Sequence, residues 1–138
     1  MEALLAAGGS GDLPTNDGKT PLMGAAQSNH AGIVKLLLEA GADKDAQDTD
    51  GATALRCAAG GGHEAVVEVL LAAGCSVDLP TSDGMTPLMC AVLSKHAGTV
   101  KQLLEAGADK ALVCSSGRTA RRYAEERDYD AVVALLRD

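Results

Sequence analysis

Apolar residues recur along the chain in short stripes that have the spacing of one helix face. The first clear stripe contains Val34, Leu37 and Leu38, which are spaced i, i+3, i+4. This spacing predicts a helix from about Gly32 to Ala40 with one apolar side. Gly41 follows directly, and glycine is a common residue where a helix ends in a left-handed conformation. We therefore expect Gly41 to end this helix.

A shorter helix is expected before this one. Thr20 and Pro21 provide a hydroxyl that can cap a helix and a proline that suits its first position, because proline has no amide hydrogen. They predict a helix from about Leu22 to Asn29, followed by a tight turn. Residues 42–51 are polar and rich in aspartate, and should form an extended loop. The local pattern is helix, turn, helix, loop.

The same pattern recurs every 33 residues. Glycine and threonine mark each unit, at Gly18, Gly51, Gly84 and Gly117 and at Thr20, Thr53, Thr86 and Thr119. Such a period is the signature of a stacked repeat protein. We assign one domain over residues 1–138, with a partial N-terminal repeat at 1–14, repeats at 15–47, 48–80 and 81–113, and a C-terminal capping repeat at 114–138. Residues 13–45 and 79–111 agree at 24 of 33 positions, which indicates that a block of two repeats was duplicated.

The two ends of the stack are expected to differ, because a terminal repeat needs a polar outer surface. In the last repeat, Arg121 takes the place of the core leucines Leu22, Leu55 and Leu88, and Arg137 takes that of the core leucines Leu38, Leu71 and Leu104. These two replacements predict a C-terminal cap. The N-terminal edge has no such cap, so we expect a monomer, with self-association through that edge as the alternative.

The composition disfavours several classes of partner. The net charge of −7 argues against nucleic acid, because phosphates are bound by basic side chains. No stretch approaches the roughly 18 to 20 apolar residues that span a bilayer, so no membrane is expected as a partner. The chain has four cysteines and no secretory signal, and we expect four free thiols in a reducing compartment, the cytoplasm or the nucleus.

No motif indicates catalysis or a cofactor. The histidines His30, His63 and His96 lie 33 residues apart, and stacked repeats would hold them too far apart to share one zinc ion. The acidic run at 43–51 lacks the two carboxylates that a calcium loop needs at its ends. The glycines at 60–62 lack the lysine and hydroxyl residue of a phosphate-binding loop. We predict a protein with no active site, no metal and no cofactor.

The repeated motifs resemble those of the ankyrin repeat family. They are Gly18-Lys19-Thr20-Pro21-Leu22, Gly62-His63, Val34 with Leu37-Leu38, and Gly41-Ala42-Asp43. The resemblance implies an all-α ankyrin-repeat solenoid of antiparallel helix pairs joined by hairpin-like loops. It also implies a protein–protein interaction module or scaffold that binds a partner on its concave face and loop tips. One departure is that the family's usual histidine after Thr-Pro-Leu is replaced by Met23, Arg56, Met89 and Arg122.

The family's partner-binding positions, carried onto this chain, are the loop tips and the exposed faces of the first helices. We select as candidates Asp17, Lys19, Asp50, Arg56, Asp83, Met85, Met89, Leu93 and Arg118. Packing of Met89 between repeats is an equal alternative. Residues 1–113 contain 14 acidic and 7 basic residues, whereas residues 114–138 contain 5 of each. A basic segment of a partner is therefore expected to dock across the first three units.

Two alternatives to a scaffold stay open. The chain is either a regulatory or targeting segment of a larger multidomain enzyme, which the uncapped N-terminal edge permits, or a stand-alone inhibitor. The second alternative is similar to the small ankyrin proteins that block cyclin-dependent kinases. Those proteins have a shortened second repeat, whereas every internal unit of this chain has full length, so the inhibitor ranks lower.

Overall fold

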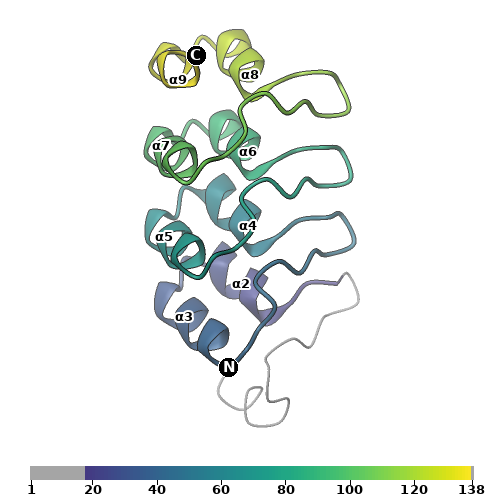
Figure 1. Cartoon of the computed structure of the whole chain (residues 1–138), viewed down its shortest axis with the longest axis vertical. Coiled ribbons are helices and arrows are strands. Elements are labelled where there is room, and N and C mark those ends of the chain that lie inside the picture. Colours follow the sequence, from purple (N-terminus) through teal and green to yellow (C-terminus); the bar gives the residue numbers. More distant parts are fainter. Residues whose placement is uncertain (1–17, 138) are drawn as a thin grey trace.

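The computed structural model describes residues 18–137, which form four helix pairs, here called units one to four (Figure 1). The first helices of the units are α2 (Pro21–Gln27), α4 (Ala54–Gly61), α6 (Pro87–Leu93) and α8 (Ala120–Glu126). The second helices are α3 (Ala31–Glu39), α5 (Glu64–Ala72), α7 (Ala97–Glu105) and α9 (Asp130–Leu136). These residues contain no strand, so the predicted all-α solenoid of helix pairs is confirmed. The predicted partial repeat at 1–14 lies outside the described residues.

Each first helix begins after a threonine whose hydroxyl accepts a hydrogen bond from the amide three residues later. The distances are 3.2 Å for Thr20, 3.1 Å for Thr53, 3.3 Å for Thr86 and 3.1 Å for Thr119. The first turn of a helix leaves several amides without a partner, and the hydroxyl satisfies one of them. The cap predicted at Thr20 is therefore confirmed, and it recurs in every unit.

The turn inside each pair is made by one residue in the left-handed conformation. These residues and their φ angles are Asn29 (62°), Gly62 (69°), Lys95 (59°) and Asp128 (53°). Because Asn29 belongs to the turn, α2 ends two residues before the predicted end, and α3 begins and ends one residue early. Gly41 has a φ of 94° after α3, which confirms its predicted place at the helix end.

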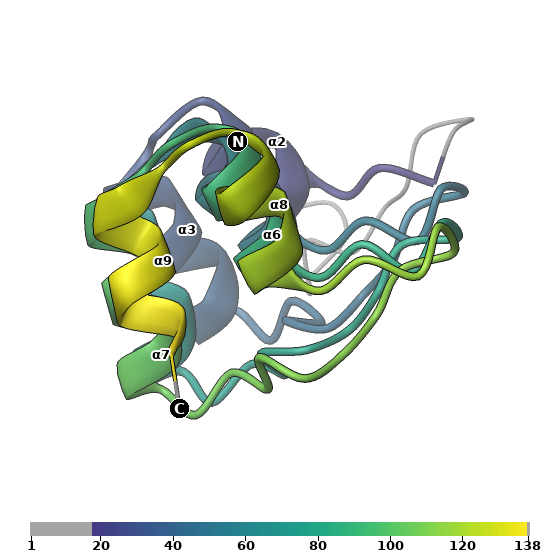
Figure 2. The same ribbon diagram turned by 90° about the horizontal axis from the view of Figure 1, so that it is seen from above.

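The pairs stack in two layers. In the layer of first helices, α4 packs between α2 and α6, and α6 packs between α4 and α8. The second helices follow the same order, α3 on α5, α5 on α7 and α7 on α9. The core between the layers is aliphatic, and Val34, Val67 and Val100 at its centre are each 0% exposed. The loops between units project together to one side of the helices (Figure 2).

Neighbouring loops lie against each other through their backbones. A Cβ atom at Gly51 would lie 2.9 Å from the Cα of Thr81, and Gly51 has a φ of 81°. Next to this contact, the Ser82 amide donates to the Asp50 carbonyl oxygen at 2.8 Å. Both the close approach and the positive φ require glycine at this position. Gly51 therefore fixes how the loop of unit two is placed against that of unit three.

The last unit carries charge where the others carry leucine. Arg121 is exposed and pairs with Glu125 at 3.4 Å, whereas Leu22 and Leu88, at the same repeat position, are each 1% exposed. Arg137 is also exposed. The leucines at its repeat position in the other units are half-buried and pack against the core; they are Leu38, Leu71 and Leu104. Within residues 18–137, no helix is long and apolar enough to cross a membrane.

Candidate functional site

A groove of about 910 Å³ lies where the loop tips meet the first helices of units one to three. Its lining combines charged and apolar side chains, among them Lys19, Asp50, Arg56, Asp83, Met85 and Leu93. The loops supply one wall, and α2, α4 and α6 supply the floor. Because the lining comes from three consecutive units, the groove exists only in the stacked array.

The loop wall is held by side-chain caps within each loop. Asp48 accepts hydrogen bonds from the amides of Asp50 and Ala52, each at 2.9 Å. At the equivalent place in the next loop, the Thr81 hydroxyl accepts one from the amide four residues later at 3.2 Å. These bonds hold the tips in place and leave Asp50 and Asp83 exposed. Among the described residues, no ion pair or side-chain hydrogen bond engages the carboxylates of these two tip residues.

Arg56 of α4 lines the floor of the groove. Cys57 in α4 and Cys90 in α6 also line it and are each 7% exposed. Burial raises the pKa of both thiols, and the nearby Arg56 guanidinium opposes that rise. The guanidinium therefore lies at the boundary of units two and three. Arg56 is exposed, whereas Met23 and Met89 at the same repeat position are each 1% exposed.

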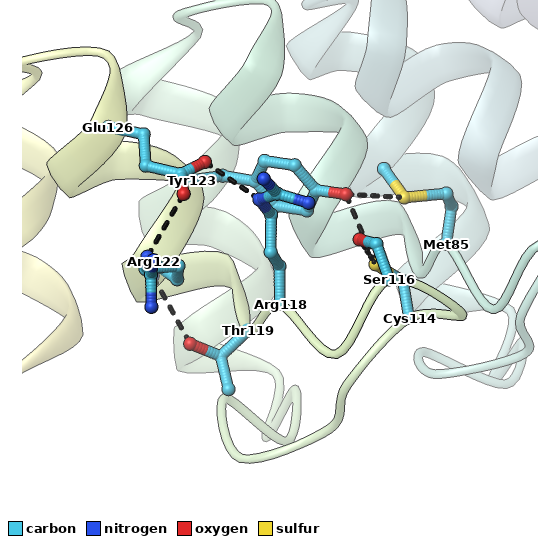
Figure 3. Close-up of polar contacts among 8 residues, drawn as sticks. All are labelled: Met85, Cys114, Ser116, Arg118, Thr119, Arg122, Tyr123 and Glu126. Carbon is cyan, nitrogen blue, oxygen red and sulfur yellow. Dashed lines mark hydrogen bonds and ion pairs between the residues drawn. The ribbon is translucent and has the colours of Figure 1, made fainter.

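Unit three also contributes two apolar side chains to the lining of the groove. Met85 in the loop and Leu93 at the end of α6 are both half-buried. The Met85 sulfur lies 3.6 Å from the Tyr123 hydroxyl oxygen. Tyr123 belongs to α8, so this contact fixes Met85 against unit four (Figure 3).

Beyond the groove, unit four carries a network of charged side chains around Glu126 (Figure 3). Arg118 Nε lies 2.8 Å from one carboxylate oxygen of Glu126, and Arg122 Nε lies 3.0 Å from the other. The hydrogen bond from Arg118 is the main cause that lowers the pKa of Glu126, and it raises the pKa of Arg118. The Arg118 guanidinium also lies 5.9 Å from the centre of the Tyr123 ring. Arg118 and Glu126 therefore neutralise each other within unit four.

Cys114 is embedded in the same network. Its sulfur lies 3.0 Å from the Ser116 hydroxyl oxygen and 3.1 Å from the Tyr123 hydroxyl oxygen. Hydrogen bonds from these hydroxyls, Ser116 first, lower the pKa of the thiol to about 6 against the opposing effect of burial. Cys114 stands at the loop position that Asp48 occupies in unit two, where a carboxylate accepts two amides. The position therefore suits a hydrogen-bond acceptor, which is a carboxylate in unit two, a hydroxyl in unit three and the Cys114 sulfur in unit four.

Comparison with models of protein families places these features in a known architecture. A model described as ankyrin repeats (3 copies) matches residues 40–114 and 79–138, and one described as ankyrin repeats (many copies) matches residues 4–58. This chain belongs to the ankyrin repeat family. A search of curated protein sequences finds no significant match to it.

Six of the nine candidates selected from the ankyrin pattern line the groove. They are Lys19, Asp50, Arg56, Asp83, Met85 and Leu93. Met89 does not, because it is 1% exposed and packs in the core, which corrects its selection as a surface residue. Arg118 is engaged by Glu126 outside the groove lining. Asp17 lies outside the described residues.

The ankyrin pattern also predicts some residues that we did not select. Cys57 and Cys90 line the groove, and both occupy the repeat position of Gly24, an exposed residue of α2. This shared repeat position could have assigned both cysteines to the floor from the sequence. The sequence gives no indication of the network around Tyr123, because residues 114 and 123 meet only when the loop folds. Among residues 18–137, no group of three or more His, Cys, Asp or Glu side chains is placed to hold a metal ion. All four cysteines are buried and free.

Proposed function

We propose that this ankyrin chain is a binding module that holds a segment of another protein in the groove across units one to three. Ankyrin repeats are generally protein–protein interaction modules. The observation that carries the proposal is the groove itself, in which loop tips and first helices of three units form one concave surface. Three units acting together supply more contact area than a single repeat, which a specific interface needs.

The charge of the groove favours a basic partner segment over nucleic acid. Asp50 and Asp83 present exposed carboxylates at the loop tips. The excess of acidic residues also lies in residues 1–113, which hold 14 acids and 7 bases. Complementary charge raises the rate of encounter and rejects partners of like charge, such as a phosphate backbone.

The two thiols that line the groove are not suited to act as nucleophiles. Burial raises the pKa of Cys57 and Cys90 in the groove, so both are neutral near pH 7 and are poor nucleophiles. Four buried free thiols also suit a reducing compartment, and we place the protein in the cytoplasm or the nucleus as a monomer.

The proposal is tested by affinity capture from extracts of the source cells with charge-reversed variants. The groove variant carries Asp50→Lys and Asp83→Lys. Its matched control carries Glu68→Lys and Glu105→Lys, which change the same number of exposed acids on the second helices α5 and α7. Far-ultraviolet circular dichroism first establishes that both variants fold.

Quantitative mass spectrometry then compares the captured proteins. A binding module predicts proteins that the wild type and the control retain and that the groove variant loses. A set of captured proteins that the groove variant leaves unchanged, or that the control loses equally, would contradict the proposed function.

A further inference from the structure

The groove carries charges of both signs, in separate places. Arg56 rises from the floor at the boundary of units two and three. Asp50 and Asp83 stand on the loop wall of the same two units. The structure contains no ion pair between Arg56 and any described residue. A partner that fills the groove therefore covers a cation as well as approaching two carboxylates.

Covering Arg56 restricts the chemistry of the occupant. Removing a charged group from water is costly unless the partner supplies an opposite charge or hydrogen-bond acceptors. An occupant with basic side chains only would also bring like charge close to the guanidinium, which costs further free energy. Arg56 is exposed and lines the groove, so an occupant that fills the groove removes water from around the guanidinium.

The apolar part of the lining restricts the occupant in a second way. Met85 and Leu93 are half-buried and line the groove, so the exposed part of each offers apolar area to an aliphatic side chain of the occupant. Methionine is flexible and adapts to the shape of such a side chain. Unit three therefore accepts an apolar residue in the same groove as the charged side chains.

From these observations we infer that the occupant is a mixed-charge segment of another protein. An acidic side chain pairs with Arg56, a basic side chain pairs with Asp50 and Asp83, and an aliphatic side chain packs on Met85 and Leu93. This inference rests on the proposed function, since it names the partner chemistry of the same groove. Its new content is the acidic residue, which the overall acidity of the chain argues against.

The test uses synthetic peptides with blocked ends, in a serine and glycine background. The mixed series contains one lysine, one glutamate and one leucine in every order and spacing. The basic series has serine in place of the glutamate, and the acidic series has serine in place of the lysine. Fluorescence anisotropy measures the dissociation constant of each peptide for the whole chain.

Three variants locate the effect. Arg56→Met installs the residue that units one and three have at this repeat position, so it is compatible with the fold. Arg56→Glu reverses the charge. Lys101→Glu makes the same change of net charge as Arg56→Glu, at an exposed site on α7 outside the groove.

We expect the best mixed peptides to bind the wild type about tenfold more tightly than their basic counterparts, the value of one close charge pair. Arg56→Met should abolish this preference, Arg56→Glu should reverse it, and Lys101→Glu should leave it unchanged. Tighter binding of the basic series, with affinity increased by Arg56→Met, would overturn the inference and leave the proposed function standing. Failure of all series to bind would also overturn it, and the capture experiment judges the proposed function separately.

Discussion

Units one and three have nearly the same sequence but bury different kinds of residue on their second helices. In unit one, Leu36 is 54% exposed and Ile33 is only half-buried. At the same repeat positions in unit three, Gln102 is half-buried and Thr99 is 0% exposed. The apolar pair is thus the more exposed of the two. At these two repeat positions, the packing around the helix and not the polarity of the residue decides which side chain is buried.

The contacts of α7 explain this reversal. The helix lies between α5 and α9, and Gln102 Nε2 donates to the Glu64 carbonyl oxygen of α5 at 3.0 Å. The Thr99 hydroxyl and the side-chain amide oxygen Oε1 of Gln102 are buried without a hydrogen-bond partner. An unpaired buried polar atom costs about 1 to 3 kcal/mol. Unit three tolerates this cost because it has a neighbouring unit on both sides.

The largest expected difference is in the cores of the two units. Leu37 and Leu103 are both 0% exposed. Replacing either one by alanine should lower the free energy of unfolding by about 2 to 5 kcal/mol. We expect Leu103→Ala to cost more, because unit three couples units on both sides and its loss disconnects the stack. Urea unfolding followed by circular dichroism measures both variants. A larger loss for Leu37→Ala would break the comparison.

The next largest effect is the pH dependence of the stabilisation by Cys114, which should differ from that of the other thiols. Its folded pKa of about 6 lies below the ordinary value of 9.0, so its stabilising effect is complete above about pH 9 and is lost as the pH falls through about 6. The advantage of the wild type over Cys114→Ala in free energy of unfolding should therefore grow between pH 6 and pH 9. Urea unfolding across this range measures it, with thiolate absorbance as a direct check.

Cys90 is the matched control for this titration. Burial raises the pKa of Cys90 above 9.0, so Cys90→Ala should change its difference from the wild type only above about pH 9. Parallel curves for the two alanine variants between pH 6 and 9 would show that the hydroxyls of Ser116 and Tyr123 do not stabilise a thiolate.

A smaller gain is expected from Thr99→Val. Valine has nearly the shape of threonine and removes the unpaired hydroxyl, so the variant should be more stable by about 1 kcal/mol. Thr86→Val is the control within the same unit, because its hydroxyl caps α6 and its loss should cost about 1 kcal/mol. Thermal unfolding compares the two. A destabilised Thr99→Val would mean that the hydroxyl has a partner.

The smallest effect is expected at Leu36. Leu36→Gln places the residue of unit three in unit one, and an exposed site should change stability by less than about 0.5 kcal/mol. The same urea measurement applies. A loss of more than about 1 kcal/mol would show that Leu36 is covered in solution.

Most of the fold followed from the sequence because each element has a local cause that repeats. The threonine caps and the glycine after α3 predict helix ends within two residues of those observed, and the 33-residue period predicts the stack. The predicted helix extended to Asn29, because asparagine occurs both in helices and in turns and its presence does not mark a turn. Its φ of 62° is imposed by the turn.

The groove was only partly predictable, for a different reason. Arg56 and Met89 occupy the same repeat position, and long side chains there can lie on the surface or in the core. The structure places one in each. Arg118 was selected for its loop position, but its partner Glu126 lies eight residues along the chain and meets it only after the loop folds.

Amide hydrogen exchange of the native chain tests most directly whether position in the stack governs stability. The segments 22–40 and 88–106 have similar amino-acid sequences, so intrinsic helix propensity differs little between them. Unit three packs on both neighbours, and opening it requires breaking two interfaces. The account predicts faster exchange in residues 22–40 than in residues 88–106. Equal or greater protection of residues 22–40 would contradict it.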